Sequence, residues 1–172
     1  MAKVAFILDQ MYEYSEFRVP YDRVKEAGHE PIVIGIEAGK KLEGKSSGDT
    51  VTTEKAIGDV SSDEFAALVI PGGYSPDKIR TDAKMVRLTK DIYSAGKPVA
   101  AICHAGWMLA EADIVKNKTV TSWPSIKTDL KNAGAEWVDQ EVVEDGNLIT
   151  SRKPDDLEAF TKALLSQIEQ TT

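Results

Sequence analysis

Four short and almost unbroken apolar runs constrain the fold of this chain more than any other feature. They occupy residues 3–8, 31–36, 65–70 and 99–102. A strand that is apolar along its whole length is typical of a sheet whose two faces are both covered. Helix-like stretches at residues 14–27 and 82–95 separate these runs. Strands that alternate with helices predict parallel βαβ units, and therefore a doubly wound, mostly parallel α/β sheet flanked by helices.

The rest of the chain continues this alternation after one interruption. Residues 37–60 are polar and rich in turn residues, which predicts an excursion with one or two short edge strands. Further strands are expected at 118–122, 137–143 and 148–151, and further helices at 105–112, 125–133 and 154–167. Asp145-Gly146-Asn147 is typical of a hairpin turn. The length of 172 residues suits a single domain, expected to cover residues 1–172.

The charge balance argues against several classes of partner. The net charge is −7, and Lys and Arg are spread along the chain without a basic block. Nucleic acids and anionic membranes are bound by basic surfaces, so neither is expected as a partner. No apolar segment approaches the ~18 residues that span a bilayer, and the first residues lack the pattern of a signal peptide. We expect a cytoplasmic protein that needs neither a cofactor nor a metal.

Cys103 is the strongest candidate for chemistry. It is the only cysteine, so it has no partner for an intramolecular disulfide. It directly follows the buried strand at 99–102 and precedes a helix, the arrangement of a nucleophile elbow. The helix N-terminus favours thiolate over thiol, which predicts a depressed pKa for Cys103. The alternative is a buried cysteine that packs as a small apolar side chain.

Three further positions lie where strands end, and each has a plainer interpretation. The backbone N–H of His104 is a candidate oxyanion donor, although His104 also suits a solvated position; its ring need not contact the sulfur across a sharp turn. Gly72 and Gly73 follow a buried strand and offer unobstructed N–H groups, or form only a turn. Glu16, near the start of the first helix, either complements the helix dipole or reaches Cys103 and tunes its protonation, being itself partly protonated.

Several separated motifs resemble one known family. They are YEYSEF at 12–17, PGGYSPD at 71–77, AICHAGW at 101–107, TSWPS at 121–125, NAGA at 132–135 and TSRKPDDL at 150–157. In this order they resemble the PfpI family of intracellular cysteine proteases and glyoxalase- or deglycase-like proteins, within the superfamily of the parkinsonism-associated deglycase. The resemblance implies a flavodoxin-like fold, like that of class I glutamine amidotransferases, with the nucleophile elbow at Cys103.

The resemblance also implies roles for individual residues. Cys103 and His104 match the catalytic pair, and Glu16 matches the glutamate that hydrogen-bonds the thiol. The protease-like members complete a triad with an acidic residue from a neighbouring subunit, and that position here is Asp77. This implies a homodimer or a larger homo-oligomer. Asp77 is one methylene shorter than the glutamate of some relatives, and otherwise it would only cap the short helix around 78–80. The usual Cys-His-Gly-Pro motif is altered here and reads Cys-His-Ala-Gly-Trp, and Trp107 on the following helix is expected to help wall the site or its access.

Three functions are compatible with a reactive thiol. The first is a stress-protective glyoxalase or deglycase, in which the sulfur adds to a small reactive carbonyl compound or acts on a glycated amine. The second is an intracellular cysteine peptidase with a Cys-His-Asp triad shared between subunits. The third is a non-enzymatic stress protein that senses oxidants through Cys103. Small α-dicarbonyls are electrophilic enough for thiol addition, and no peptide groove is evident in the sequence, so the first function is preferred.

Overall fold

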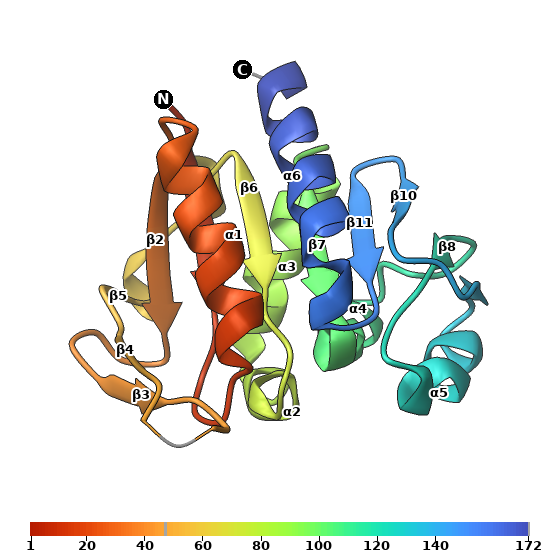
Figure 1. Cartoon of the computed structure of the whole chain (residues 1–172), viewed down its shortest axis with the longest axis horizontal. Helices are drawn as coiled ribbons and strands as arrows, with labels where there is room; N and C mark the ends of the chain where they lie inside the picture. The colour runs from red at the N-terminus through yellow and green to blue at the C-terminus, as the bar shows by residue number, and fades with distance from the viewer. Residues whose placement is uncertain (47, 172) are drawn as a thin grey trace.

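The computed structural model describes residues 1–46 and 48–171, and a seven-stranded sheet forms its centre (Figure 1). The strands lie in the order β10-β11-β7-β6-β1-β2-β5, and among these described strands only β10 runs antiparallel to its neighbour. Their bounds are β1 Lys3–Ile7, β2 Glu30–Gly35, β5 Lys55–Ala56, β6 Ala67–Ile70, β7 Val99–Ile102, β10 Val143–Asp145 and β11 Leu148–Ser151.

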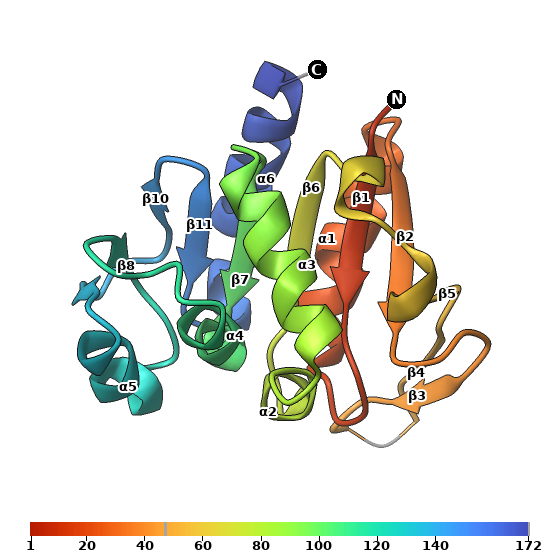
Figure 2. The same ribbon diagram turned by 180° about the vertical axis from the view of Figure 1, so that it is seen from behind.

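Helices cover both faces of this sheet. Helices α1 (Tyr14–Glu26) and α6 (Leu157–Thr171) pack side by side on one face, in front in Figure 1. Helices α3 (Ala83–Ser94) and α4 (Gly106–Glu111) lie on the other face, which Figure 2 shows. Alternate residues of β1 serve the two layers: Phe6 packs toward α1 and α6, whereas Ile7 packs toward α3 and α4. This arrangement confirms the doubly wound sheet expected from the apolar runs.

Residues 37–60, where one or two short edge strands were expected, form three short strands in the part that the structure describes. Strands β3 (Lys41–Glu43) and β4 (Thr50–Thr52) pair as a small antiparallel sheet, and β5 joins the edge of the main sheet. Two 3-10 helices, η1 (Ile57–Asp59) and η2 (Ser62–Glu64), lead back to β6. The first long helix begins at Tyr14 and tolerates Pro20 in its interior.

Two of the expected strands are wrong as members of the main sheet. Within the described residues, Thr119–Val120 (β8) pairs only with Glu136–Trp137 (β9), in a separate two-stranded parallel sheet. The strand expected at 137–143 is not continuous: its first residue ends β9, its last begins β10, and the residues between them are not in a strand. The small sheet holds the 3-10 helix η4 (Pro124–Ile126) and α5 (Lys127–Asn132) beyond the carboxyl ends of the main strands. The β10–β11 hairpin is present as expected.

The strand order reverses direction beside β1, and this places the site. From β1 the chain first adds β2 and β5 on one side, then returns to add β6, β7 and β11 on the other. Such a switch point opens a crevice at the carboxyl ends of the strands. The helix α2 (Ser75–Ile79), the start of α1 and the 3-10 helices η3 (Cys103–Ala105) and η5 (Pro154–Asp156) lie at this edge. The first strand begins and the last helix ends at the opposite edge (Figures 1 and 2).

Candidate active site

Cys103 occupies a sharp turn between β7 and the 3-10 helix η3. Its φ angle is 63°, in the left-handed region that side chains other than glycine seldom adopt. The turn follows directly from a fully buried strand, and the α4 helix begins three residues later, at Gly106. The Cys103 residue is only 9% exposed. This is the strand–turn–helix geometry of a nucleophile elbow.

The surroundings of the sulfur oppose the expected thiolate. Burial, followed by the charge of Glu16, raises the pKa of the Cys103 thiol to about 12, although the backbone N–H groups of His104 and Gly73 act in the other direction. The expectation of a depressed thiol pKa is therefore wrong for the protein as described. The helix that follows has only six residues, and the 3-10 turn separates it from the sulfur, so its dipole does not offset burial.

Glu16 lies beside the elbow as a buried carboxyl group. Its Oε1 accepts a hydrogen bond from the Gly72 N–H at 2.8 Å, whereas its Oε2 is buried and has no partner within the described residues. Burial is the largest cause that raises its pKa, to about 8. At neutral pH Glu16 is therefore mostly protonated, and burial is the main cause, whereas the sequence-based hypothesis had relied on repulsion from an anionic Cys103 sulfur. Its unpartnered Oε2 is available to donate or accept a proton.

The two glycines after β6 have different duties. The N–H of Gly72 is already committed to Glu16, so the expectation that it serves as an oxyanion donor is wrong. Gly72 is needed for space, because a Cβ there would lie 2.8 Å from the Cβ of Cys103 and 2.9 Å from the Ile102 carbonyl oxygen. The N–H of Gly73 instead acts to lower the pKa of the Cys103 thiol, and the φ of 83° at this residue suits glycine. Gly73 and His104 thus supply the two backbone donors near the sulfur.

The His104 ring contacts the sulfur directly, which the sequence analysis did not require. Its Nδ1 lies 3.3 Å from Cys103 Sγ, and its Nε2 lies 3.3 Å from Ser125 Oγ. Burial and the Lys45 cation lower the pKa of His104, so the imidazole is neutral at pH 7 and able to accept a proton.

Two tryptophans flank this imidazole. The Trp107 ring centroid lies 5.1 Å from that of His104, and the Trp123 centroid lies 6.3 Å away. Trp107 is held in place because its indole N–H donates to Asp129 at 2.9 Å. Trp107, which was expected to wall the site, lies beside the His104 ring. Trp123 was not among the predicted site residues, although it lies within the TSWPS motif.

Within the described residues of one chain, the Asp77 side chain forms no hydrogen bond or ion pair with the other candidate site residues. It is exposed on α2, and no hydrogen bond of its side chain is present within the described residues. Its own N–H donates to the Tyr74 carbonyl at 3.1 Å. The helix begins at Ser75, so Asp77 lies inside it and does not cap it; that alternative interpretation is wrong.

Lys45 is a site neighbour that the sequence did not reveal. It forms an ion pair with Glu13 at 3.4 Å, and its charge lowers the pKa of both His104 and Cys103. Its backbone N–H donates to the Tyr12 carbonyl at 2.9 Å, which ties its loop to the segment between β1 and α1. Lys45 falls in the polar interruption, where no periodic pattern marks one residue above another.

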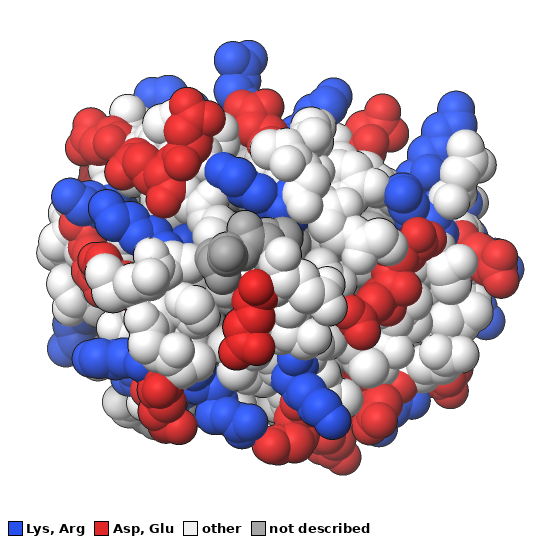
Figure 3. Space-filling view, turned by 90° about the horizontal axis from the view of Figure 1, so that it is seen from above, with Lys and Arg blue, Asp and Glu red and all other residues white. Residues whose placement is uncertain are grey.

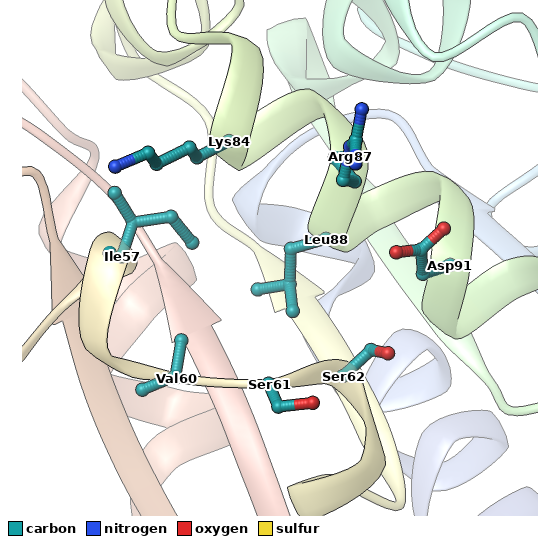
Figure 4. A pocket seen from close by; sticks show the side chains of 9 residues that line it. Ile57, Val60, Ser61, Ser62, Lys84, Arg87, Leu88 and Asp91 are labelled. Carbon is teal, nitrogen blue, oxygen red and sulfur yellow. The ribbon is translucent and has the colours of Figure 1, made fainter.

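A hollow of about 260 Å³ lies away from this site (Figure 4). Apolar side chains from η1 and α3, including Ile57 and Leu88, form its inner wall, and Lys84 and Arg87 extend from α3. None of the candidate site residues lines it. Within the described residues there is no group of three or more His, Cys, Asp or Glu side chains placed to hold a metal ion.

The outer surface and the helices give two further findings. Acidic and basic side chains are interspersed over the face at the amino ends of the strands (Figure 3). Across the described part of the chain, no helix has both the length and the apolar character needed to cross a membrane.

The fold and the elbow define the class of protein, an α/β protein with a cysteine at the nucleophile turn. Residues 2–167 match the DJ-1/PfpI family, and the chain belongs to this family. It is 46% identical over 164 residues to "Protein/nucleic acid deglycase 2" of Escherichia coli, covering 95% of each chain. It is 44% identical over 169 residues to "General stress protein 18" of Bacillus subtilis, covering 98% of each.

A solved structure agrees over almost the whole chain. A two-domain protein from Anabaena variabilis, which contains a DJ-1/ThiJ/PfpI-like and a ferritin-like domain, superposes with a TM-score of 0.96 at 40% identity. The match covers 98% of this chain but only 48% of that protein. The family and the fold expected from the motifs are thereby confirmed.

Proposed function

We propose that the chain is a cysteine-dependent, stress-protective enzyme of the glyoxalase or deglycase type, acting on small reactive carbonyl compounds or on glycated amines. One observation carries this proposal: the Cys103 sulfur lies 3.3 Å from the His104 imidazole, whose pKa is lowered by burial, at a turn next to the buried Glu16 carboxyl group, whose pKa is raised by burial. The deglycase and stress-protein names of the two relatives support the same chemistry. The proposed catalytic residues are Cys103, His104 and Glu16.

The geometry fits addition of a thiol whose proton leaves as the new bond forms. The Cys103 thiol proton passes to His104 Nδ1 while the sulfur adds to the aldehyde carbon of an α-dicarbonyl. The carbonyl oxygen gains the electron pair of its π bond, and the Gly73 N–H is placed to stabilise it until a proton returns to give a hemithioacetal. A thiol with a raised pKa is not a handicap here, because its proton is transferred at the moment of attack.

The remaining steps need a group that exchanges protons near neutral pH. A proton moves from the hemithioacetal carbon to the adjacent carbonyl carbon, and the hydroxyl proton moves to the oxygen of that former carbonyl, which gives a thioester. Water hydrolyses the thioester to a 2-hydroxy acid and the free thiol. Glu16 has a pKa near 8 and an unpartnered oxygen, so it suits this proton transfer. Overall, one dicarbonyl and one water give one hydroxy acid.

The exposure of the sulfur favours a small substrate over a peptide. Cys103 is only 9% exposed, and the tryptophan beside His104 restricts approach from that side. A peptidase must bind an extended chain across its nucleophile. A peroxide sensor needs thiolate character, which the raised pKa of Cys103 opposes.

The deciding experiment is consumption of methylglyoxal without added glutathione, comparing the wild type with Cys103→Ser. We expect the wild type to release lactate and the variant to lose activity at least a hundredfold, with an unchanged circular dichroism spectrum. Cleavage of a fluorogenic peptide by the wild type, with no consumption of methylglyoxal, would instead favour the peptidase. Rapid peroxide oxidation of Cys103 without any turnover would favour the sensor.

Asp77 belongs to this proposal only through assembly. The Asp77 side chain is exposed and, within the described residues, forms no hydrogen bond with the His104 of its own chain. It can therefore complete a triad only at the His104 of another copy, in a homo-oligomer, which we place in the cytoplasm. Sedimentation at micromolar concentration tests the first condition, since a monomer has no shared triad. In an oligomer, Asp77→Asn is expected to lower activity while Cys103 can still be alkylated. Full activity of that variant would leave Asp77 without a role at the site.

A further inference from the structure

The outer nitrogen of His104 faces a hydroxyl group from a separate element of the same chain. Ser125 is the middle residue of η4, and its Oγ lies 3.3 Å from His104 Nε2. The inner nitrogen, Nδ1, lies 3.3 Å from Cys103 Sγ. An imidazole that takes the thiol proton on Nδ1 carries N–H groups on both nitrogens, and the outer one then needs an acceptor. We propose that Ser125 is a positioning residue that accepts this hydrogen bond and thereby favours proton transfer from Cys103 to His104.

The segment that carries Ser125 is fastened to the elbow. The Trp123 N–H donates to the Cys103 carbonyl at 3.3 Å, and the Ile126 N–H closes the turn on the Trp123 carbonyl at 3.2 Å. Asp129, on the helix that follows, accepts the indole N–H of Trp107. These contacts hold the segment on both sides of the imidazole, so the backbone that carries the serine hydroxyl keeps its place.

The charged groups around the imidazole are paired with other residues, so the hydrogen-bond partner of His104 Nε2 within the chain is the neutral Ser125 hydroxyl. Lys45 is the cation that acts on His104, and it is itself paired with Glu13. Asp129 is committed to Trp107. Arg80, whose guanidinium carbon lies 5.8 Å from the Trp107 ring centroid, is paired with Glu111 at 3.1 Å.

Glu16 faces the elbow from α1 and accepts a hydrogen bond from Gly72. The hydrogen-bond partners of the His104 ring within the described residues are Cys103 and Ser125, and neither is a carboxylate. The outer nitrogen has one N–H, so Ser125 and the Asp77 of a neighbouring copy are alternatives for it. The chain supplies the first of them without any assembly.

The test measures the thiol and the imidazole directly. Iodoacetamide alkylation of Cys103 at pH 7 is compared among the wild type, Ser125→Ala, Ser125→Thr and Ser125→Asp, with Thr128→Ala on the adjoining helix as the matched control. Ser125→Ala is expected to react about fivefold more slowly, the effect of losing one ordinary hydrogen bond. Ser125→Thr keeps a hydroxyl and is expected to restore most of the rate. Thr128 is exposed, and its variant should react like the wild type.

A second readout separates positioning from a general structural effect. The chain has two histidines, so labelling with ¹⁵N-histidine gives two titrations. His29 accepts the Ala2 N–H on its Nδ1 at 3.2 Å and serves as the unaffected signal. Ser125→Ala should lower the pKa of His104 alone, because the imidazolium form loses its acceptor, and Ser125→Asp should raise it, because a carboxylate stabilises that form.

Wild-type alkylation together with an unshifted His104 titration in Ser125→Ala would overturn the proposal. Slower alkylation in Asp77→Asn but not in Ser125→Ala would also overturn it, and would assign the outer nitrogen to the neighbouring copy. Neither readout requires turnover of a carbonyl compound, so the proposal stands or fails separately from the proposed function.

Discussion

Two neighbouring turns at the same edge of the sheet both need a residue with a positive φ, and the chain places a different residue type in each. After β6 the chain turns at Gly73 with a φ of 83°, and after the adjacent β7 it turns at Cys103 with a φ of 63°. Glycine adopts this region freely, whereas a cysteine there costs about 1 kcal/mol or more. The glycine turn supplies space and a backbone N–H. The cysteine turn is strained, but a glycine at this position would provide no sulfur.

The other left-handed residues sharpen this contrast. Asp113 and Asn117 have φ angles of 58° and 63°, and their short polar side chains tolerate the region. Met11, with a φ of 66°, lacks such a side chain and is held by two backbone hydrogen bonds of 2.8 Å, to Glu43 and from Tyr74. Met11 and Cys103 both follow carboxyl ends of central strands, so the less tolerated strain in the described chain gathers around the candidate site.

The largest expected effect comes from filling the glycine turn. In Gly73→Ala the new Cβ would lie 2.6 Å from the Glu13 nitrogen and from the Met11 carbonyl oxygen, and φ would remain positive. The clash and the strain together should lower the free energy of unfolding by about 4 kcal/mol. Urea denaturation measures this, with Gly39→Ala as the control.

The control separates space from strain. Gly39 has a φ of 70°, but no atom lies within 4 Å of the Cβ that alanine would add, so this variant should cost only about 1 kcal/mol. Equal losses for the two variants would show that the crowding at Gly73 relaxes easily.

The next effect is a pH dependence that originates at Glu16. Its pKa is raised from 4.5 to about 8, so between these values the folded protein keeps a proton that the unfolded chain has lost. The associated stability is fully present below pH 4.5 and is lost as the pH rises toward 8, by about 1.4 kcal/mol per unit. From pH 5 to 8 the wild type should therefore lose roughly 3 to 4 kcal/mol relative to Glu16→Gln.

Urea denaturation at several pH values compares the two proteins. Glutamine keeps an oxygen for the Gly72 N–H but has no titration of its own, which makes it the matched variant. Stability curves that stay parallel from pH 5 to 8 would mean that Glu16 is charged in the folded protein. In that case its role as a neutral proton donor fails.

The smallest effect tests the cysteine turn itself. Cys103→Ala keeps the positive φ and loses the sulfur, whereas Cys103→Gly loses the sulfur and also relieves the strain. The glycine variant should therefore be the more stable of the two by about 1 kcal/mol, the reverse of the usual order. Thermal unfolding of both variants measures this difference. A more stable alanine variant would show that the turn is not strained.

The sequence predicted the sheet and the elbow because both depend on local patterns. Unbroken apolar runs identify strands such as 99–102 without knowledge of their neighbours, and a cysteine directly after one identifies the turn. The thiol pKa was predicted with the wrong sign because it depends on burial and on Glu16, which lies 87 positions earlier in the chain.

Other features escaped for the same physical reason. The two residues of β8 pair in a separate small sheet, and a periodic pattern does not say which partner a strand chooses. The contact of Ser125 with His104 depends on where that small sheet holds η4. Lys45 lies in a polar loop whose approach to the site is set by a backbone bond to Tyr12.

The position of the two chain ends has a practical consequence for handling the protein. The first strand begins and the last helix ends at the edge opposite the elbow (Figures 1 and 2). A tag, a surface anchor or a fused module at either end would therefore leave the carboxyl edge facing solution. The Anabaena variabilis protein shows that a similar domain can share its chain with a second one. Immobilised preparations should accordingly present Cys103 to soluble reagents in the same way whichever end is attached.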